Sequence, residues 1–332
     1  MKFSERIQNI SASMTLAIDA KAQEMKARGE DVIGFGAGEP DFNTPEHIKQ
    51  AGIRAIENNE TRYTPVGGSI LLKEAIITKL ERDNGLVFEK NQILASCGAK
   101  QSFYNLAQVL WQAGDEVIIP APYWVSFPDM VTLSGARPII IHADAEHNFK
   151  ITPEQIDQAV TPNTKAIVIN SPSNPTGSAY DRSELEKLAE CALRHGLLII
   201  SDEIYEYIVF DGFRHTSIAS LSKEVQKQCV VINGVSKSFA MTGWRIGYIA
   251  AGDPEIIKQT TKLQGQSTSN PCSVSQAASI AALTGPLDEV HAMVREFEKR
   301  RDILVGLLRQ IPGVTCNKPT GSFYSFPDFS GI

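Results

Sequence analysis

The sequence predicts an α/β fold whose main domain, at about residues 45–285, is built on a mainly parallel sheet. Two patterns predict this class. Seven short runs are rich in apolar residues, and most lack polar alternation, which is typical of strands covered on both faces. Helical patterns separate these runs, as in repeated strand–helix–strand units. Because ligands of such sheets bind beyond the carboxyl ends of strands, residues directly after each run are the first candidates for a site.

The predicted strands and helices alternate along the chain. The strands lie at residues 92–96, 116–119, 138–141, 166–169, 197–200, 230–232 and 246–250. Residues 69–84 and 183–195 carry apolar side chains at helical spacing. Each of these helices is expected to end at a glycine, Gly85 or Gly196, because glycine readily takes the left-handed C-cap conformation.

Both ends of the chain are expected to lie apart from the sheet. The first 40 or so residues show no strand pattern that fits it. Residues 287–308 have the pattern of a long charged helix, which the Pro312-Gly313 pair ends. Residues 314–332 then begin a further strand-like segment.

The composition excludes several classes of function. With 42% hydrophobic and 21% charged residues, it is that of an ordinary globular protein. A net charge of −6 offers no basic surface for nucleic acid or an anionic membrane. The five cysteines are scattered without metal-ligand spacing, and no apolar stretch is long enough to cross a bilayer, so we expect a cytoplasmic protein without a metal. Neither a Walker A pattern nor GxGxxG occurs, which leaves a nucleotide-binding or dehydrogenase-type protein unsupported.

Lys237 is the most informative candidate. It follows the apolar run 229–232 and has small and aromatic neighbours, so partial desolvation would lower its pKa and favour a Schiff base. Arg245, in the same segment, offers a planar cation that suits phosphate. The two together suggest pyridoxal phosphate (PLP), although this segment alone fits a solvated lysine and a structural arginine equally well.

Polar residues follow two other predicted strands. Asp202 comes directly after residues 197–201, where its carboxylate could pair with a protonated ring nitrogen; a turn or cap residue is the commoner fate of such a position. Tyr205 lies three residues later, where a helical turn would direct it to the same place. Asn174 lies in a loop stiffened by two prolines, where it could donate to a phenolate oxygen or belong to a plain turn.

Two more strand ends complete the candidate site. Residues 96–101 (SCGAKQ) place small residues before an apolar helix, expected at 102–111, and such a helix start exposes N–H groups to an anion. Trp124 follows another strand and could stack on a flat ring, although its position alone slightly favours a core aromatic. Each feature is ordinary by itself, but their shared placement after strands predicts one site.

These segments resemble the fold-type I, class I/II aminotransferases, most closely the bacterial aspartate aminotransferase subgroup. The resemblance extends over the whole chain and is carried by residues 34–41 (GFGAGEPD), 63–65 (YTP), 122–124 (PYW), 170–177 (NSPSNPTG), 201–205 (SDEIY) and 236–245 (SKSFAMTGWR). It implies a three-layer α/β/α large domain with a mainly parallel seven-stranded sheet, together with a smaller α+β domain. It also implies PLP-dependent transamination.

The resemblance assigns roles to the candidates. Lys237 would bind PLP as a Schiff base and carry the proton of the reaction, and Asp202 would pair with the ring nitrogen. Asn174 and Tyr205 would bind the phenolic oxygen, and Trp124 would stack on the ring. The phosphate would be surrounded by Gly98, Ala99, Lys100, Ser236 and Arg245.

Other implied roles concern the substrate and a second subunit. Gly38 would contact the substrate carboxylate through its backbone, and Tyr63 would reach the partner subunit's phosphate site, so a homodimer is expected. Lys100 and Thr15 match positions near the distal carboxylate in relatives that take dicarboxylates, which favours L-aspartate with 2-oxoglutarate. Ser11 stands where relatives that also use prephenate have a basic residue, which weakens that alternative.

Two departures from the family pattern stand out. Gly234 occupies a position where many relatives have a phosphate-binding serine. The family continues beyond the residue that matches Ile332, and that part carries the arginine that binds the substrate α-carboxylate. The resemblance therefore implies a small domain made of residues 1–44 and a truncated part within 286–332, around a large domain at 45–285. An alternative function is then a PLP-binding fragment without activity, and a PLP-dependent lyase is the nearest other rival.

Overall fold

The computed structural model describes residues 1–12, 14–36 and 38–332. Its centre is one seven-stranded sheet with the strand order β1-β7-β6-β5-β4-β2-β3. All seven predicted strands are confirmed, as β1 (Ile93–Ser96), β2 (Glu116–Ala121), β3 (Arg137–His142), β4 (Thr164–Asn170), β5 (Leu198–Asp202), β6 (Cys229–Gly234) and β7 (Gly247–Ala251). The sheet is mainly parallel, as expected, because only β7 runs antiparallel to its neighbours β1 and β6.

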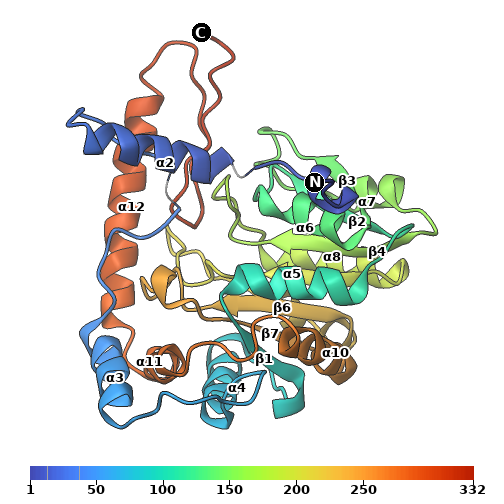
Figure 1. The fold of residues 1–332 in the computed structure, drawn as a ribbon. Coiled ribbons are helices and arrows are strands. Elements are labelled where there is room, and N and C mark those ends of the chain that lie inside the picture. Colours follow the sequence, from blue (N-terminus) through green and yellow to red (C-terminus); the bar gives the residue numbers. More distant parts are fainter. Residues whose placement is uncertain (13, 37) are drawn as a thin grey trace.

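Helices cover both faces of this sheet (Figure 1). One face packs against α4 (Ile70–Asn84), α8 (Arg182–Arg194) and α11 (Ser273–Thr284). The other face packs against α5 (Ala99–Leu110), α6 (Ser126–Ser134) and α10 (Pro254–Gly265). The three-layer α/β/α arrangement is thereby confirmed.

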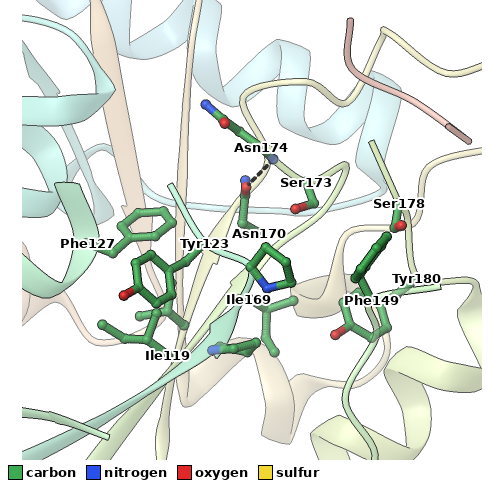
Figure 2. A pocket seen from close by; sticks show the side chains of 13 residues that line it. Ile119, Tyr123, Phe127, Phe149, Ile169, Asn170, Ser173, Asn174, Ser178 and Tyr180 are labelled. Carbon is green, nitrogen blue, oxygen red and sulfur yellow. Dashed lines mark hydrogen bonds between the residues drawn. The ribbon is translucent and has the colours of Figure 1, made fainter. Parts of the chain in front are cut away.

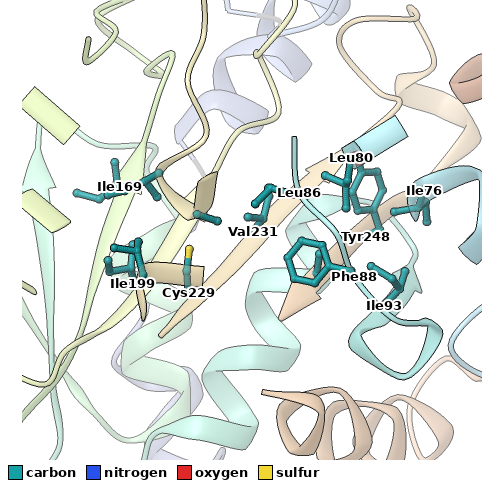
Figure 3. Close-up of a cluster of buried hydrophobic side chains, with 14 of the residues drawn as sticks. Ile76, Leu80, Leu86, Phe88, Ile93, Ile169, Ile199, Cys229, Val231 and Tyr248 are labelled. Atoms are coloured by element: carbon teal, nitrogen blue, oxygen red, sulfur yellow. The ribbon is translucent and has the colours of Figure 1, made fainter. Parts of the chain in front are cut away.

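The strand side chains alternate between two buried clusters. In β4, Ile167 and Ile169 belong to the cluster under α4 and α8, whereas Ala166 and Val168 belong to the cluster under α5 and α6. Figure 3 shows the first cluster, in which strand residues such as Val231 face the same core as residues of α4. Because both faces are apolar, polar alternation is absent from these strands.

Local sequence explains where the two predicted helices begin and end. The Ser69 side chain accepts the Leu72 N–H at 3.2 Å and so caps α4, which ends at Gly85 with a φ of 65°. Asp181 caps α8 in a capping box with Glu184. Gly196, two residues after the end of α8, has a φ of 66°, so both glycines are left-handed as predicted.

The remaining helices are short or peripheral, apart from α12. They are α1 (Glu5–Gln8), α2 (Met14–Ala27), α3 (Glu46–Glu57), α7 (Pro153–Ala159), α9 (Lys223–Lys227) and 3₁₀ turns at Lys90–Gln92, Ile218–Ser220 and Thr242–Trp244. The predicted long helix is confirmed as α12 (Asp288–Leu308), which runs along one side of the molecule in Figure 1. None of the helices in the described ranges is long and apolar enough to cross a membrane. The division of the chain at residues 44 and 285 stays a prediction.

The predicted strand within residues 314–332 is wrong. This segment forms two isolated bridges, Val209 with Gly321 and Thr315 with Asp328, and no ladder. Pro319 and Pro327 lack a backbone N–H, which limits regular pairing on either side of them. The segment instead folds back toward the sheet.

The sheet topology determines where the site lies. β6, β5, β4 and β2 are parallel, and β1 has the same direction because it is antiparallel to β7. The carboxyl ends of these five strands and the beginning of β7 therefore meet at one edge. The loops that contain Gly98, Trp124, Asn174, Tyr205 and Lys237 leave from this edge.

Candidate active site

Lys237 lies in the turn after β6, and its amine is largely desolvated. Its Nζ donates a hydrogen bond to the Gly38 carbonyl and lies 5.7 Å from the centroid of the Phe323 ring. Burial lowers the pKa of Lys237 to about 8, and the carboxylates of Glu39 and Asp202 offset part of this effect. The solvated alternative for Lys237 is therefore wrong. An amine with this pKa is nucleophilic near neutral pH.

Asp202 is the last residue of β5 and is only 6% exposed. Its Oδ1 accepts the Ile204 N–H at 3.2 Å, so it also has the turn-capping role that was the simpler reading of the sequence. Burial raises the pKa of Asp202 to about 7, against the effects of that hydrogen bond and of Lys237. Among the described residues, no cation forms an ion pair with Asp202. A cationic N–H donor would stabilise its charged form.

Asn170 joins two predicted site residues, and sequence reasoning did not single it out. At the end of β4, its Oδ1 accepts the Asn174 N–H at 2.8 Å, as Figure 2 shows. Its Nδ2 donates to the Asp202 carbonyl at 3.1 Å. The loop of Asn174 and the end of β5 are thereby tied together. Asn170 and Asn174 border a small cavity lined by aromatic residues such as Tyr123 and Tyr180.

Asn174 and Tyr205 converge, as predicted, but on a third residue that sequence reasoning missed. The Tyr324 Oη lies 2.9 Å from the Tyr205 Oη and accepts a hydrogen bond from the Asn174 Nδ2 at 3.3 Å. Phe323 packs edge-on against the Tyr205 ring. No local pattern in residues 321–326 pointed to the site, because the contact spans 150 residues in sequence.

The start of α5 and Arg245 together form an anion-binding arrangement. Gly98, with a φ of 88°, precedes the helix, and a Cβ there would lie 2.5 Å from the Arg245 Nη2. Arg245 itself has a φ of 57° and donates to the carbonyls of Thr242 at 2.9 Å and Cys97 at 3.2 Å. The helix is confirmed but begins at Ala99, three residues earlier than predicted. Its free N–H groups and the guanidinium face the same place, which suits a phosphate.

Ser236 and Gly234 lie beside this arrangement. Ser236 is buried in the turn before Lys237. A Cβ on Gly234 would lie 2.8 Å from the Ile246 carbonyl oxygen and 2.9 Å from the Gly247 Cα. A serine at this position would force β6 and β7 apart, so the close approach of these strands accounts for the departure from the family pattern.

Trp124 and Lys100 contact each other at the edge of the site. The Lys100 Nζ lies 4.9 Å from the centroid of the Trp124 ring, a cation–π geometry. Trp124 packs edge-on against Phe127 with centroids 5.2 Å apart, so it partly contributes to the core, as its position suggested. Burial and the nearby Arg245 lower the pKa of Lys100.

Three of the predicted site residues, Gly38, Thr15 and Tyr63, lie outside the loops that follow the strands. Gly38 is within reach of Lys237, as described, although its neighbour at position 37 lies outside the described residues. Thr15 is exposed in the first turn of α2. Tyr63 is 93% exposed, so a single chain does not bury it among the other site residues.

Comparisons with known proteins agree with this geometry. The family described as aminotransferase class I and II matches residues 30–332. The aspartate aminotransferase of Geobacillus stearothermophilus is 55% identical over 99% of this chain and 83% of its own length. The aspartate/prephenate aminotransferase of Cereibacter sphaeroides is 49% identical over 99% of this chain and 82% of its own.

Solved structures of aspartate aminotransferases have the same fold as this chain. The aspartate aminotransferase of Rhizobium meliloti superposes with a TM-score of 0.96 at 44% identity, over 100% of this chain and 83% of that one. The aspartate aminotransferase of Thermus thermophilus, in a structure with maleate, superposes with a TM-score of 0.94 at 39% identity, over 99% of this chain and 85% of that one. The chain is therefore an aminotransferase that belongs to the class I and II aminotransferase family.

Proposed function

We propose that this chain is a PLP-dependent aspartate aminotransferase that converts L-aspartate and 2-oxoglutarate to oxaloacetate and L-glutamate. The observation that carries the proposal is the desolvated amine of Lys237 in one site with the buried, cation-free carboxyl of Asp202. The relatives named aspartate aminotransferase, at 51–55% identity, support the choice of substrate.

The residues present fit PLP in size, charge and donor type. The buried carboxyl of Asp202 suits the protonated ring nitrogen, and the donors Asn174 and Tyr205 suit the phenolic oxygen. Gly98 leaves room beside Arg245 that a Cβ would fill, which suits the phosphate. We assign Ala99, Lys100 and Ser236 to the same phosphate site and Trp124 to the face of the ring.

Each of these residues has a distinct task in transamination. When bound, PLP serves as an electron sink for the pair left at the substrate Cα. The Lys237 amine would take the proton from that carbon and deliver it to a carbon of the cofactor. Its pKa of about 8 lets the amine both accept and release a proton near neutral pH. Asp202 keeps the ring nitrogen protonated, because the charged pair relieves the cost of burying either group alone.

The dicarboxylate preference rests on Lys100 and Thr15. We assign them to the distal carboxylate and Gly38 to the α-carboxylate through its backbone. The Thermus thermophilus structure is described with maleate, a dicarboxylate. Prephenate is the second candidate substrate, because relatives at 49% and 47% identity are named aspartate/prephenate aminotransferases.

Lys237→Ala tests the proposal. After free PLP is removed, we expect the purified chain to keep a visible absorbance band that this variant loses, since the Lys237 amine forms the Schiff base that retains the cofactor. Lys90→Ala, which removes an exposed lysine, is the matched control and keeps the band. A wild-type chain without such a band would contradict the proposal.

Product analysis separates the alternatives. With L-aspartate alone, loaded enzyme should release oxaloacetate and convert its cofactor to the amine form, without free ammonia. Ammonia or pyruvate release would instead identify a PLP-dependent lyase. Absence of any conversion would identify a PLP-binding protein without activity, and turnover of prephenate would identify the broader substrate range.

We further propose a cytoplasmic homodimer with shared active sites. The five free cysteines support a reducing compartment. The exposed ring of Tyr63 supports the dimer, because a side chain that reaches the partner's phosphate site must leave its own subunit.

A further inference from the structure

Tyr324 is held in the site by hydrogen bonds of Gly321 and Ser322, which precede it in the chain. The Gly321 N–H donates to the Gly177 carbonyl at 2.8 Å, and the Ser322 N–H donates to the Ile208 carbonyl at 2.8 Å. The fully buried Ser322 also donates its hydroxyl to the Ser173 carbonyl at 3.1 Å. The segment is therefore joined to the Asn174 loop and to the turn after β5.

The Tyr324 hydroxyl lies against Gly38. A Cβ at Gly38 would be 2.5 Å from the Tyr324 Oη, so a side chain at this position would displace the hydroxyl. The carbonyl of the same Gly38 accepts the hydrogen bond of the Lys237 amine. The Tyr324 hydroxyl and the Lys237 amine thus contact the same residue, Gly38, whose backbone we assign to the substrate carboxylate.

The hydrogen bonds of Tyr324 leave its proton available. Its oxygen accepts from the Asn174 Nδ2, and either hydroxyl can be the donor in its contact with Tyr205. A carboxylate accepts a hydrogen bond more strongly than a neutral phenol oxygen, so a substrate carboxylate within reach would take the Tyr324 proton from that contact. Burial raises the pKa of Tyr324, so the phenol stays protonated at neutral pH. A neutral O–H beside a glycine backbone is a suitable donor for a carboxylate oxygen.

We propose that Tyr324 is a substrate-binding residue whose hydroxyl donates a hydrogen bond to the α-carboxylate of the amino-acid or keto-acid substrate. This inference rests on the proposed function. Asn174 and Tyr205 are the donors that we assign to the cofactor's phenolic oxygen. The Tyr324 hydroxyl instead lies against Gly38, whose backbone we assign to the substrate carboxylate.

Tyr324→Phe tests the inference in the full chain loaded with PLP. The variant keeps the ring contacts with Phe323 and Tyr205, so it should fold, and the lost hydroxyl contacts should lower its thermal stability only slightly. Loss of a hydrogen bond to a charged group should raise the Kd of maleate, measured by calorimetry without turnover, about 10- to 100-fold. The KM values for L-aspartate and 2-oxoglutarate should rise with it, whereas the Kd of PLP should change less than about twofold. Tyr104→Phe, on the partly exposed side of α5, is the matched control and should leave all values unchanged.

The outcomes separate this inference from the proposed function. A variant with a weakened PLP Kd and unchanged maleate Kd would place Tyr324 on the cofactor and overturn the inference. A variant identical to wild type would show a packing role only and also overturn it. A wild-type chain that binds no PLP would contradict the proposed function, and the inference with it.

Discussion

At the scale of single residues, the buried carboxyl of Asp202 destabilises the folded protein when it is ionised and no cation is bound beside it. Its carboxyl ordinarily has a pKa of 3.8, and burial raises this to about 7. The folded state therefore holds a proton that the unfolded chain has lost between about pH 4 and pH 7. The free energy of unfolding of cofactor-free protein should fall as the pH rises through this window, by on the order of 4 kcal/mol from this group.

Asp202→Asn removes this pH dependence. The neutral amide has about the same size but does not ionise, so the variant should lose little stability between pH 4 and pH 8 from this position. Urea unfolding of cofactor-free protein at several pH values measures the effect, and Asp31→Asn, at an exposed position, is the control. If the wild type and Asp202→Asn kept a constant difference across this range, the buried carboxyl would not have the pKa described.

The sequence predicts those site residues that follow a strand within a few positions. Lys237, Asp202 and Asn174 follow apolar runs, so topology alone brings them to one edge of the sheet. Their hydrogen-bond partners could not be predicted in this way. The Gly38 carbonyl, for example, is 199 residues from Lys237 in sequence. Tyr324 belongs to a segment that gave a false strand signal, and only the folded chain brings it to Asn174.

At the scale of elements, a buried polar cluster connects three of them behind the site. Lys79 of α4 is 1% exposed and pairs with Glu206, which lies in the turn after β5. Glu206 also accepts from the Asn233 Nδ2 of β6 at 2.7 Å and from the Asn84 Nδ2 at 2.9 Å. The turn with Tyr205 and the strand that leads to Lys237 are thereby held to the same helix.

Lys79→Met should be strongly destabilising. It leaves Glu206 buried without its cation, which typically costs about 3–5 kcal/mol. The double variant Lys79→Met with Glu206→Met should regain much of this loss, since well-packed apolar groups can replace a buried ion pair. Chemical denaturation measures both, and Lys90→Met, which removes an exposed pair with Glu74, should cost less than about 1 kcal/mol.

Lys79 also shows which features of a helix the sequence alone does not predict. The helix at 69–84 was predictable from its apolar face and its caps, but a lysine within it reads as solvated until Glu206 is placed opposite. Strands were predictable because covered strands are uniformly apolar. The start of α5 was placed too late because the polar residues Lys100 and Gln101 interrupt the apolar signal, although Gly98 is already the N-cap of the helix.

At the scale of the whole molecule, one chain leaves large apolar side chains in solvent on α3 and at the start of α4, the two helices that flank Tyr63 in sequence. Ile53 and Ile56 of α3 are 44% and 57% exposed, and Ile70 and Leu71 at the start of α4 are 60% and 66% exposed. Exposed apolar groups of this size commonly indicate an interface. In the homodimer that we propose, a second copy of the chain would cover these side chains, and its Lys237 would share a site with this Tyr63.

Mixing two inactive variants tests the shared site directly. In a mixed dimer of Tyr63→Ala and Lys237→Ala subunits, one site combines the intact Lys237 of the first with the intact Tyr63 of the second, and the other site has both defects. If subunits exchange at random, half of the dimers are mixed, so about a quarter of the sites should regain wild-type cofactor binding and turnover. Activity after co-refolding at equal concentrations, compared with each variant refolded alone, measures this recovery. If Tyr63 acted only within its own subunit, every site would keep one defect and mixing would restore nothing.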